Sequence, residues 1–373
     1  MAAQDVAQAG RPHLDGTEHA LGVDARTGGR ADDVGERGER RAQRRRRDLA
    51  VPADVLEVSD PVLASQVLAQ GAELVGPAFD EQGDGRAELL DVFGVVGLVQ
   101  GCQLSGATLL RFRHNDLDDA AAAYDTIPRE SLARGAGVYL VADSVFSMDG
   151  DLFDLPAAHR FCRERGVFMI LDEAHGIACV GPTGRGIEEH FDMPSTVDLL
   201  LGNFSKGIPS TGGYATGDRR VIEFLRCGYA APHTFSSPLS PYHCGAACKA
   251  LEILEREPEH VERLHRMSSR LRRELRRRGF DTGLSETPIV PLIVGSERDT
   301  LAVWRYLLDR GYFTGAVVAP AVGLGRARLR LIANAKHDPA DVDAFVDCVS
   351  EAMDRVRGAS AAPSFTGGRQ EQT

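Results

Sequence analysis

Lysine is almost absent from this chain of 373 residues. Only three positions carry it, whereas 40 residues are arginine; the three are Lys206, Lys249 and Lys336. Arginine stays protonated and is a poor amine nucleophile, so a lysine kept against this background indicates a task that arginine cannot perform. None of the three follows a glycine, which excludes the GxxxxGKS/T phosphate loop of P-loop ATPases.

Other features are missing as well. No apolar run approaches the ~20 residues that cross a bilayer, and the N-terminus lacks the apolar core of a signal peptide. The seven cysteines form no CxxC pair, so we interpret them as reduced packing residues and expect no metal site. The net charge of -11 argues against a general nucleic-acid binder. We therefore predict a cytoplasmic protein with no membrane span and no nucleic-acid partner.

The composition of the chain changes near residue 100. Residues 1–50 are rich in glycine, alanine, aspartate and arginine without periodicity, which favours disorder. The apolar pieces of residues 51–100 fit short strands or helices in no recognisable order. After Gly101, apolar runs alternate with amphipathic segments, which is typical of a mostly parallel sheet covered by helices, followed by a smaller α+β domain. We predict strands at 138–142, 167–171, 197–201, 214–217, 289–294 and 327–331, and helices at 155–165, 241–255, 259–278, 300–310 and 339–355.

Two neighbouring strands of this predicted sheet end in reactive side chains. One apolar run leads directly into Asp172 and His175, and the next is followed by Lys206. In a parallel sheet, ligands lie beyond the carboxyl ends of the strands, where Ser147 also falls. A lysine there can form a Schiff base with the aldehyde of pyridoxal phosphate (PLP), and an acid can keep the pyridine nitrogen protonated. The pattern therefore predicts a PLP site.

Each of these residues also has a plainer interpretation. Asp172 alone could cap a following helix, and His175 alone could be a structural histidine. The string Asp-Glu-Ala-His also occurs in one class of helicase ATPases, but the missing phosphate loop excludes that class. We expect His114 to be structural, because the residues after it look like a helix N-cap, and Arg328 to be a structural partner.

Nine short segments point, by their order and spacing, to one known family. They are G-C-Q-L-S-G-A (101–107), F-R-H-N-D (112–116), V-F-S-M-D-G-D (145–151), L-D-E-A-H-G (171–176), G-P-T-G-R-G (181–186), F-S-K (204–206), G-G-Y (212–214), F-S-S-P-L-S-P (235–241) and A-R-L-R (327–330). On these segments, residues 101 to about 356 resemble the α-oxoamine synthases. The resemblance implies the α/β, mostly parallel architecture of the PLP-dependent transferase fold type I. Its parts would be a partial PLP-binding large domain at 101–235 and a small C-terminal α+β domain at 236–357. The tail at 358–373 is rich in small and polar residues, and we expect it to be disordered.

The resemblance also implies an activity and residue roles. Family members are homodimers that use PLP to join an amino acid to an acyl-CoA, releasing an α-aminoketone, coenzyme A and usually carbon dioxide. Lys206 resembles the Schiff-base lysine, Asp172 the partner of the pyridine nitrogen and His175 the group beside the ring hydroxyl. Arg330 resembles the arginine that grips the amino-acid carboxylate, which suits its planar fork. Further expected cofactor contacts are Ser147, Asn203, Ser205 and, reaching the phosphate across the dimer interface, Ser236 and Ser237.

Departures from the family pattern concentrate in the first hundred residues. The family carries a glycine-rich phosphate loop and, just before the G-C-Q-L-S-G-A segment, a histidine that stacks on the pyridine ring. Residues 1–100 contain no glycine-rich loop with the family's flanking residues and no histidine just before Gly101. Asn203 stands where the family usually has threonine, and Gly323 where it has proline. We therefore expect an incomplete large domain and weak PLP binding, and we keep a non-catalytic partner subunit as the alternative function.

Overall fold

The computed structural model describes residues 55–58, 86–91, 96–226 and 238–360. All of them belong to one unit formed by residues 51–373. The expected disorder of residues 1–50 and the predicted domain boundary at residue 235 lie outside the described residues. The division into a large and a small domain therefore stays a prediction.

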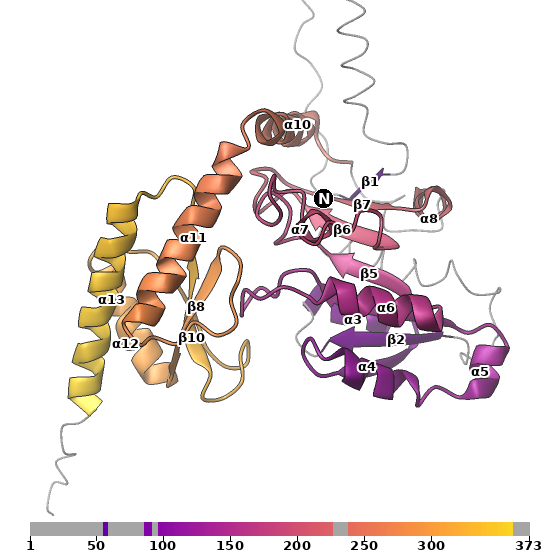
Figure 1. Ribbon diagram of the computed structural model, residues 1–373, viewed down its shortest axis with the longest axis horizontal. Helices are drawn as coiled ribbons and strands as arrows, with labels where there is room; N and C mark the ends of the chain where they lie inside the picture. Colours follow the sequence, from indigo (N-terminus) through magenta and orange to yellow (C-terminus); the bar gives the residue numbers. More distant parts are fainter. Residues whose placement is uncertain (1–54, 59–85, 92–95, 227–237, 361–373) are drawn as a thin grey trace, which may run out of the picture. The chain divides into compact units, whose positions relative to one another are not determined.

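A seven-stranded sheet occupies the first part of the described chain (Figure 1). Its strands follow the order β1-β7-β6-β5-β4-β2-β3, and those from β6 to β3 run parallel, whereas β7 is antiparallel to both β6 and β1. The predicted mostly parallel sheet is confirmed, and the first hundred residues supply two of its strands. The strands are β1 (Val55–Val58), β2 (Arg86–Asp91), β3 (Thr108–Phe112), β4 (Gly137–Asp143), β5 (Phe168–Asp172), β6 (Leu199–Asn203) and β7 (Gly213–Gly217).

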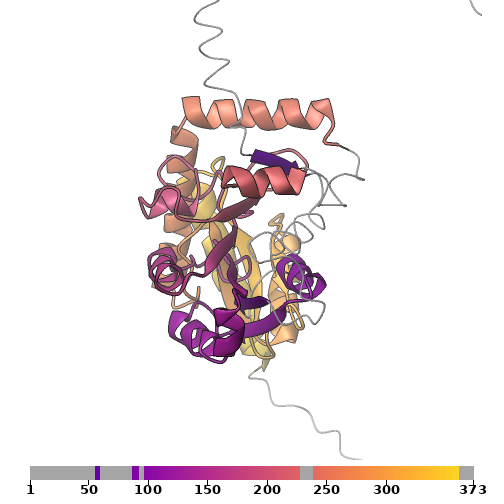
Figure 2. The ribbon, with the colours of Figure 1, turned by 90° about the vertical axis from the view of Figure 1, so that its right-hand side faces the viewer.

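Helices cover both sides of this sheet (Figure 2), and the side chains of β4 show why its strands are apolar throughout. Leu140 belongs to a core that includes residues of α4 and α6, whereas Tyr139 belongs to a core that includes residues of α3 and α8. Both side chains are fully buried. A strand covered on both sides needs apolar residues at successive positions. The helices are α3 (Val96–Leu104), α4 (Leu117–Tyr124), α5 (Arg129–Ala133), α6 (Leu155–Arg165), α7 (Ile187–His190) and α8 (Arg219–Phe224).

Helix α6 begins and ends where the sequence predicts. The Asp154 side chain accepts a hydrogen bond from the Ala157 N–H at 2.9 Å, and Pro156 lies in the first turn. Gly166 ends the helix in the left-handed conformation, with a φ of 65°. The chain then enters β5, at whose carboxyl end Asp172 lies.

A three-stranded antiparallel sheet with four helices forms the remainder of the described chain. Its core joins the sheet to α11, α12 and α13 through buried side chains such as Leu271, Val303 and Val346. The α+β elements predicted for this region are confirmed. They are β8 (Ile289–Gly295), β9 (Gly315–Val317), β10 (Ala327–Ile332), α10 (Pro241–Arg256), α11 (Glu259–Arg277), α12 (Glu297–Leu308) and α13 (Pro339–Ser360).

Two of these helices differ from the predicted bounds by more than one residue. Helix α12 begins before residue 300 because the Ser296 side chain caps it, accepting a hydrogen bond from the Asp299 N–H at 3.3 Å. Helix α13 continues to Ser360, so the predicted disorder is wrong for residues 358–360. No proline interrupts this helix before Pro363.

Gly150 links the loop after β4 to the start of β8. Its carbonyl oxygen accepts hydrogen bonds from the N–H groups of Glu286 and Thr287 at 3.0 and 3.1 Å and from the Thr287 hydroxyl at 2.9 Å. Its φ of 72° is in the left-handed region, and a Cβ here would lie 2.0 Å from the carbonyl oxygen of Ile289. Only glycine combines this backbone conformation with so close an approach.

A half-buried histidine fixes the end of β2. His114 Nε2 lies 2.8 Å from Asp151 Oδ2, and Nδ1 lies 3.3 Å from Asp91 Oδ1. The ring meets that of Phe146 edge to face, with centroids 4.2 Å apart. Burial alone would lower the pKa of His114. The hydrogen bonds and negative charges of the two aspartates together outweigh this effect, so the pKa is raised to about 9. The imidazole is therefore protonated at neutral pH, which agrees with the structural role predicted for it.

We expect His114 to make the protein less stable as the pH rises above neutrality. The pKa of its imidazole increases from 6.5 to about 9 in the folded chain. Its stabilising contribution is therefore complete below pH 6.5 and is lost as the pH rises through 9. This difference corresponds to about 3 kcal/mol. His114→Gln should remove that part of the pH dependence in urea unfolding measured across the range. Parallel curves for the two proteins would contradict a charged imidazole.

Candidate functional site

The carboxyl ends of β4, β5 and β6 lie side by side. The strand register pairs Asp143 of β4 with Asp172 of β5, and Asp172 with Leu201 of β6. Just beyond, the Ser144 N–H donates to the Asp172 carbonyl oxygen at 2.9 Å. Lys206 follows shortly after the end of β6. The fold therefore brings one amine and two carboxylates to the same edge of the sheet.

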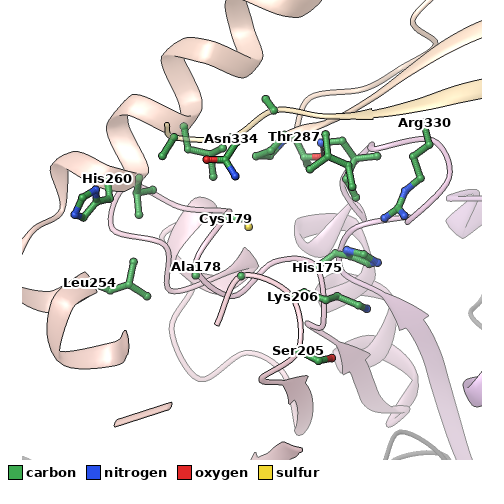
Figure 3. Close-up of a pocket in the computed structure, with 18 residues that line it drawn as sticks. His175, Ala178, Cys179, Ser205, Lys206, Leu254, His260, Thr287, Arg330 and Asn334 are labelled. Atoms are coloured by element: carbon green, nitrogen blue, oxygen red, sulfur yellow. Dashed lines mark hydrogen bonds between the residues drawn. The ribbon is translucent and has the colours of Figure 1, made fainter. Parts of the chain in front are cut away.

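A cavity of about 550 Å³ opens at this edge. Lys206, His175 and Arg330 line one side of it, with Ser205 beside them (Figure 3). Lys206 and His175 follow strands of the seven-stranded sheet, whereas Arg330 lies on β10. Cavities of this size are typical of small-molecule sites. Residues far apart in the sequence thus share one candidate ligand site.

The Lys206 amine lies in an environment that favours its neutral form. Its side chain stays accessible through the cavity, yet desolvation by the surrounding protein lowers its pKa, and Arg330 acts in the same direction. Asp172 and Asp143 counteract this by raising the pKa. A neutral amine is the form that can act as nucleophile or base.

Asp172 is half-buried at the end of β5. Burial raises the pKa of its carboxyl group, whereas the Ala174 N–H, which donates to Oδ1 at 2.7 Å, and the nearby Lys206 lower it. This hydrogen bond from the backbone two residues further on forms an Asx turn, which orients the carboxylate of Asp172. Turns rather than a helix follow this residue, so the interpretation of Asp172 as a helix cap is wrong.

His175 is neutral at physiological pH. Burial lowers the pKa of its imidazole to about 3, and the positive charges of Lys206 and Arg330 add to the shift. A neutral imidazole has one donor and one acceptor nitrogen. His175 therefore offers polar contacts to a ligand without adding a third positive charge to this side of the cavity.

Arg330 presents an incompletely satisfied guanidinium. The residue is half-buried, and burial lowers the pKa of its guanidinium. Its Nε atom is buried and has no hydrogen-bond partner among the described residues. Buried polar atoms normally have partners. A donor left without one, on a side chain that favours planar carboxylates, suits an anionic ligand.

Arg328 has a different role two positions earlier on the same strand. The side chain is only 3% exposed, and its Nη1 atom donates to Asp149 Oδ1 at 2.6 Å and to the Met148 carbonyl oxygen at 3.1 Å. This agrees with the structural role predicted for Arg328. The bonds hold β10, which carries Arg330, against the loop that carries Ser147.

Glu173 supports the turn on which His175 lies. Its carboxyl group is 1% exposed and accepts hydrogen bonds from the Ile187 N–H at 3.1 and 3.2 Å. It fills space that two glycines leave open: a Cβ on Gly176 would lie 1.4 Å from Glu173 Oε1, and one on Gly186 would lie 2.6 Å from Cδ. These contacts explain the glycines that end the L-D-E-A-H-G and G-P-T-G-R-G segments.

The remaining predicted site residues are placed less directly. Ser147 is half-buried and is not among the residues that line the cavity. Asn203 accepts a hydrogen bond from the Ser205 N–H at 3.3 Å, which fixes the turn before Lys206. Ser236 and Ser237 lie outside the described residues. Cofactor contacts by these residues stay predictions.

Besides the supporting role of Glu173, two features of the site were not predicted from the sequence. Asp143 directly follows the predicted strand 138–142, so the same strand-end rule that indicated Asp172 could have indicated it. Leu254, Val261 and Leu264 line the cavity from α10 and α11. Their apolar spacing on helices gives no sign of whether they face a core or a ligand.

Comparison with known proteins agrees with this geometry. The aminotransferase class I and II family model matches residues 96–349. The chain belongs to this family. One of its relatives is 8-amino-7-oxononanoate synthase of Anaeromyxobacter dehalogenans (strain 2CP-C). The two chains are 36% identical over 263 residues, which cover 70% of this chain and 64% of that enzyme.

Further relatives confirm the resemblance to the α-oxoamine synthases. Serine palmitoyltransferase of Sphingobacterium spiritivorum is 33% identical over 273 residues, covering 73% of this chain and 67% of that enzyme. The high-resolution structure of SPT with PLP internal aldimine has a TM-score of 0.74 and 26% sequence identity, covering 83% of this chain and 75% of that chain. The predicted fold type I architecture is therefore confirmed.

This family member matches only part of its relatives. It spans 64% of the length of the first of them, which is less than two thirds. Within the portion that the structure describes, no helix is both long enough and apolar enough to cross a membrane.

Proposed function

We propose that this protein is a PLP-dependent acyltransferase. It condenses an amino acid with an acyl-CoA and yields an α-aminoketone, coenzyme A and usually carbon dioxide. The observation that carries the proposal is the meeting of an amine, a carboxylate and a guanidinium, from Lys206, Asp172 and Arg330, at one site. Similarity to 8-amino-7-oxononanoate synthase and serine palmitoyltransferase supports it. Retention of all three groups favours an enzyme over a non-catalytic partner subunit.

The residues present fit PLP at several points. The amine of Lys206 suits the cofactor aldehyde, and the carboxylate of Asp172 suits the pyridine nitrogen. The Nε atom of Arg330, which has no partner among the described residues, suits the carboxylate of the amino acid. We assign to His175 a contact with the ring hydroxyl. Further proposed cofactor contacts are Ser147, Asn203, Ser205, Ser236 and Ser237.

Each group then contributes a defined step. When bound, PLP supplies an electron sink that stabilises negative charge on the α-carbon of the amino acid. Lys206 acts as the base that takes the α-proton, and its lowered pKa increases the fraction of free amine. The carboxylate of Asp172 would keep the pyridine nitrogen of the cofactor protonated. Arg330 holds the amino-acid carboxylate and so orients the α-carbon towards the amine.

Titration of the purified chain with PLP tests this proposal. We expect a visible absorbance band to appear with added PLP, and borohydride reduction to fix the cofactor covalently on the chain. Binding should be weak, because phosphate affinity in such sites comes largely from backbone N–H groups of a loop and helix N-terminus, and the family's glycine-rich loop was not found in the sequence. Absence of any band at saturating PLP would favour the non-catalytic partner subunit.

We further propose a homodimer located in the cytoplasm. The resemblance to the family supports the dimer, because Ser236 and Ser237 match residues that reach the cofactor of the neighbouring subunit. The cysteines of the described residues are free thiols, which is typical of a reducing compartment and supports the location. Light scattering of the purified protein tests the assembly, and a mass of one chain, 40.2 kDa, would contradict it.

Arg330→Lys should raise the KM for the amino acid while leaving PLP binding nearly unchanged. Lysine replaces a planar pair of donors with a point charge, so the carboxylate loses one of two charge-assisted hydrogen bonds. We expect a rise in KM of about tenfold or more. The control is Arg326→Lys, which changes an exposed arginine just before the same strand. An unchanged KM for Arg330→Lys would place the carboxylate elsewhere.

A further inference from the structure

The catalytic cavity has two chemically different ends. Lys206, His175 and Arg330 make one end polar. The other end carries the apolar side chains of Leu254 and, on α11, Val261 and Leu264, next to His260. Figure 3 shows Leu254 on the opposite side of the cavity from Lys206 and Arg330. The proposed reaction uses the polar end for the cofactor and the amino acid. The apolar end therefore remains for the second substrate.

The charged groups near the apolar end already pair with one another. Among the described residues that line the cavity, the arginine and the lysine both lie at the polar end. His260, which lines the other end, has its Nε2 atom 3.2 Å from Glu257 Oε2. Glu257 also pairs with Arg256, at 2.6 Å between Oε1 and Nη2. A carboxylate entering here would find no uncommitted cation among the described residues of the cavity lining.

A second cavity of mixed lining lies near the first. It has a volume of about 440 Å³ and shares Ile332 and Ala333 with the first. Its lining combines apolar residues such as Val342 and Phe345 with His337 and Asp341. The second cavity therefore lies beside the end of β10, and the lining of the first cavity alone carries the inference that follows.

We propose that the acyl group of the thioester substrate is an uncharged hydrocarbon chain that lies against Leu254, Val261 and Leu264. An acyl chain that ends in a carboxylate is disfavoured, because that group would lose its hydration without gaining an ion pair. A hydrocarbon chain gains by leaving water for the same surface. The inference rests on the proposed function and narrows its substrate from acyl-CoA in general to acyl-CoA with an apolar chain.

Two unreactive thioethers of matched length test the inference by binding alone. S-octyl-CoA and S-(7-carboxyheptyl)-CoA lack the reactive carbonyl, so calorimetric titration at saturating PLP reports affinity without turnover. We expect S-octyl-CoA to bind at least about tenfold more tightly, with a negative heat-capacity change from apolar burial. Equal or tighter binding of the carboxylated analogue would overturn the inference and leave the proposed function intact. Failure of both analogues to bind would overturn the acyl-CoA substrate as well.

A substitution at the apolar end adds a second test. Leu254→Arg places a cation where the chain is proposed to lie, so S-octyl-CoA should bind about tenfold more weakly and the preference over the carboxylated analogue should shrink or reverse. Leu251→Arg is the matched control, because it makes the same change on the same helix at an exposed leucine that is not among the cavity-lining residues. Circular dichroism confirms that both variants fold. Identical analogue preferences for the two variants would contradict the placement of the chain.

Discussion

Lys206→Ala should abolish both covalent attachment of PLP and turnover, whereas Lys249→Ala should retain both. The chain has only one other lysine, so few amines compete for the aldehyde. Lys206 lines the cavity with a pKa lowered by desolvation, whereas Lys249 lies on α10 and pairs with Glu252 at 3.0 Å. The measurement combines the visible absorbance of bound PLP, the mass of the borohydride-reduced protein and the release of coenzyme A from an acyl-CoA.

The pattern of failure in this experiment is informative. A reduced adduct of normal yield in Lys206→Ala would remove Lys206 from its proposed role. Loss of the adduct in Lys249→Ala as well would point to a general effect of removing a lysine. A protein that binds PLP without reacting in either form would support the non-catalytic partner subunit.

Gly150→Ala should be the most destabilising of the single substitutions considered. The added Cβ would lie 2.0 Å from the Ile289 carbonyl oxygen, and the φ of 72° disfavours any residue with a Cβ. Overpacking and the left-handed backbone together should lower the free energy of unfolding by roughly 3–4 kcal/mol. Thr287 would also lose its close approach to the Gly150 carbonyl, so the loop that carries Ser147 should move. Urea unfolding followed by circular dichroism measures the change.

Gly245→Ala provides the control for that experiment. Gly245 lies within α10, and a Cβ there meets no atom within 4 Å. Alanine favours helices, so this substitution should raise the free energy of unfolding by roughly 0.5–1 kcal/mol. If both glycine variants changed stability equally, the close approach at Gly150 would not be the reason why glycine is needed there.

Most of the fold could be predicted from local patterns after residue 100. The strand that leads to Asp172 and the helix ended by Gly166 carry strong signals, because a strand covered on both faces is apolar and a left-handed glycine ends a helix. Short elements such as α5 and β9 carry too few residues for a periodic signal. The placement of β2 between β3 and β4 depends on pairing with residues distant in the sequence, which no local pattern encodes.

The candidate site could be predicted only where its residues follow strands. Asp172 and Lys206 were found because parallel strands deliver their carboxyl ends to one edge. Arg330 depended on family resemblance, since an arginine on a strand gives no sign of where it points. Glu173 was missed as a support, because its role follows from the space left by Gly176 and Gly186 in three dimensions.

The pairing of β1 with β7 affects how the chain folds during synthesis. Val55–Val58 pair with residues 213–216, so the partner strand is made more than 150 residues later. At about 5–20 residues per second, a ribosome needs on the order of 10–30 s to produce that partner. Until then β1 is an isolated peptide, and closure of the sheet at this edge is a late event of long-range pairing. A chain that begins after residue 58 would leave β7 with unpaired backbone groups and a tendency to associate with other strands.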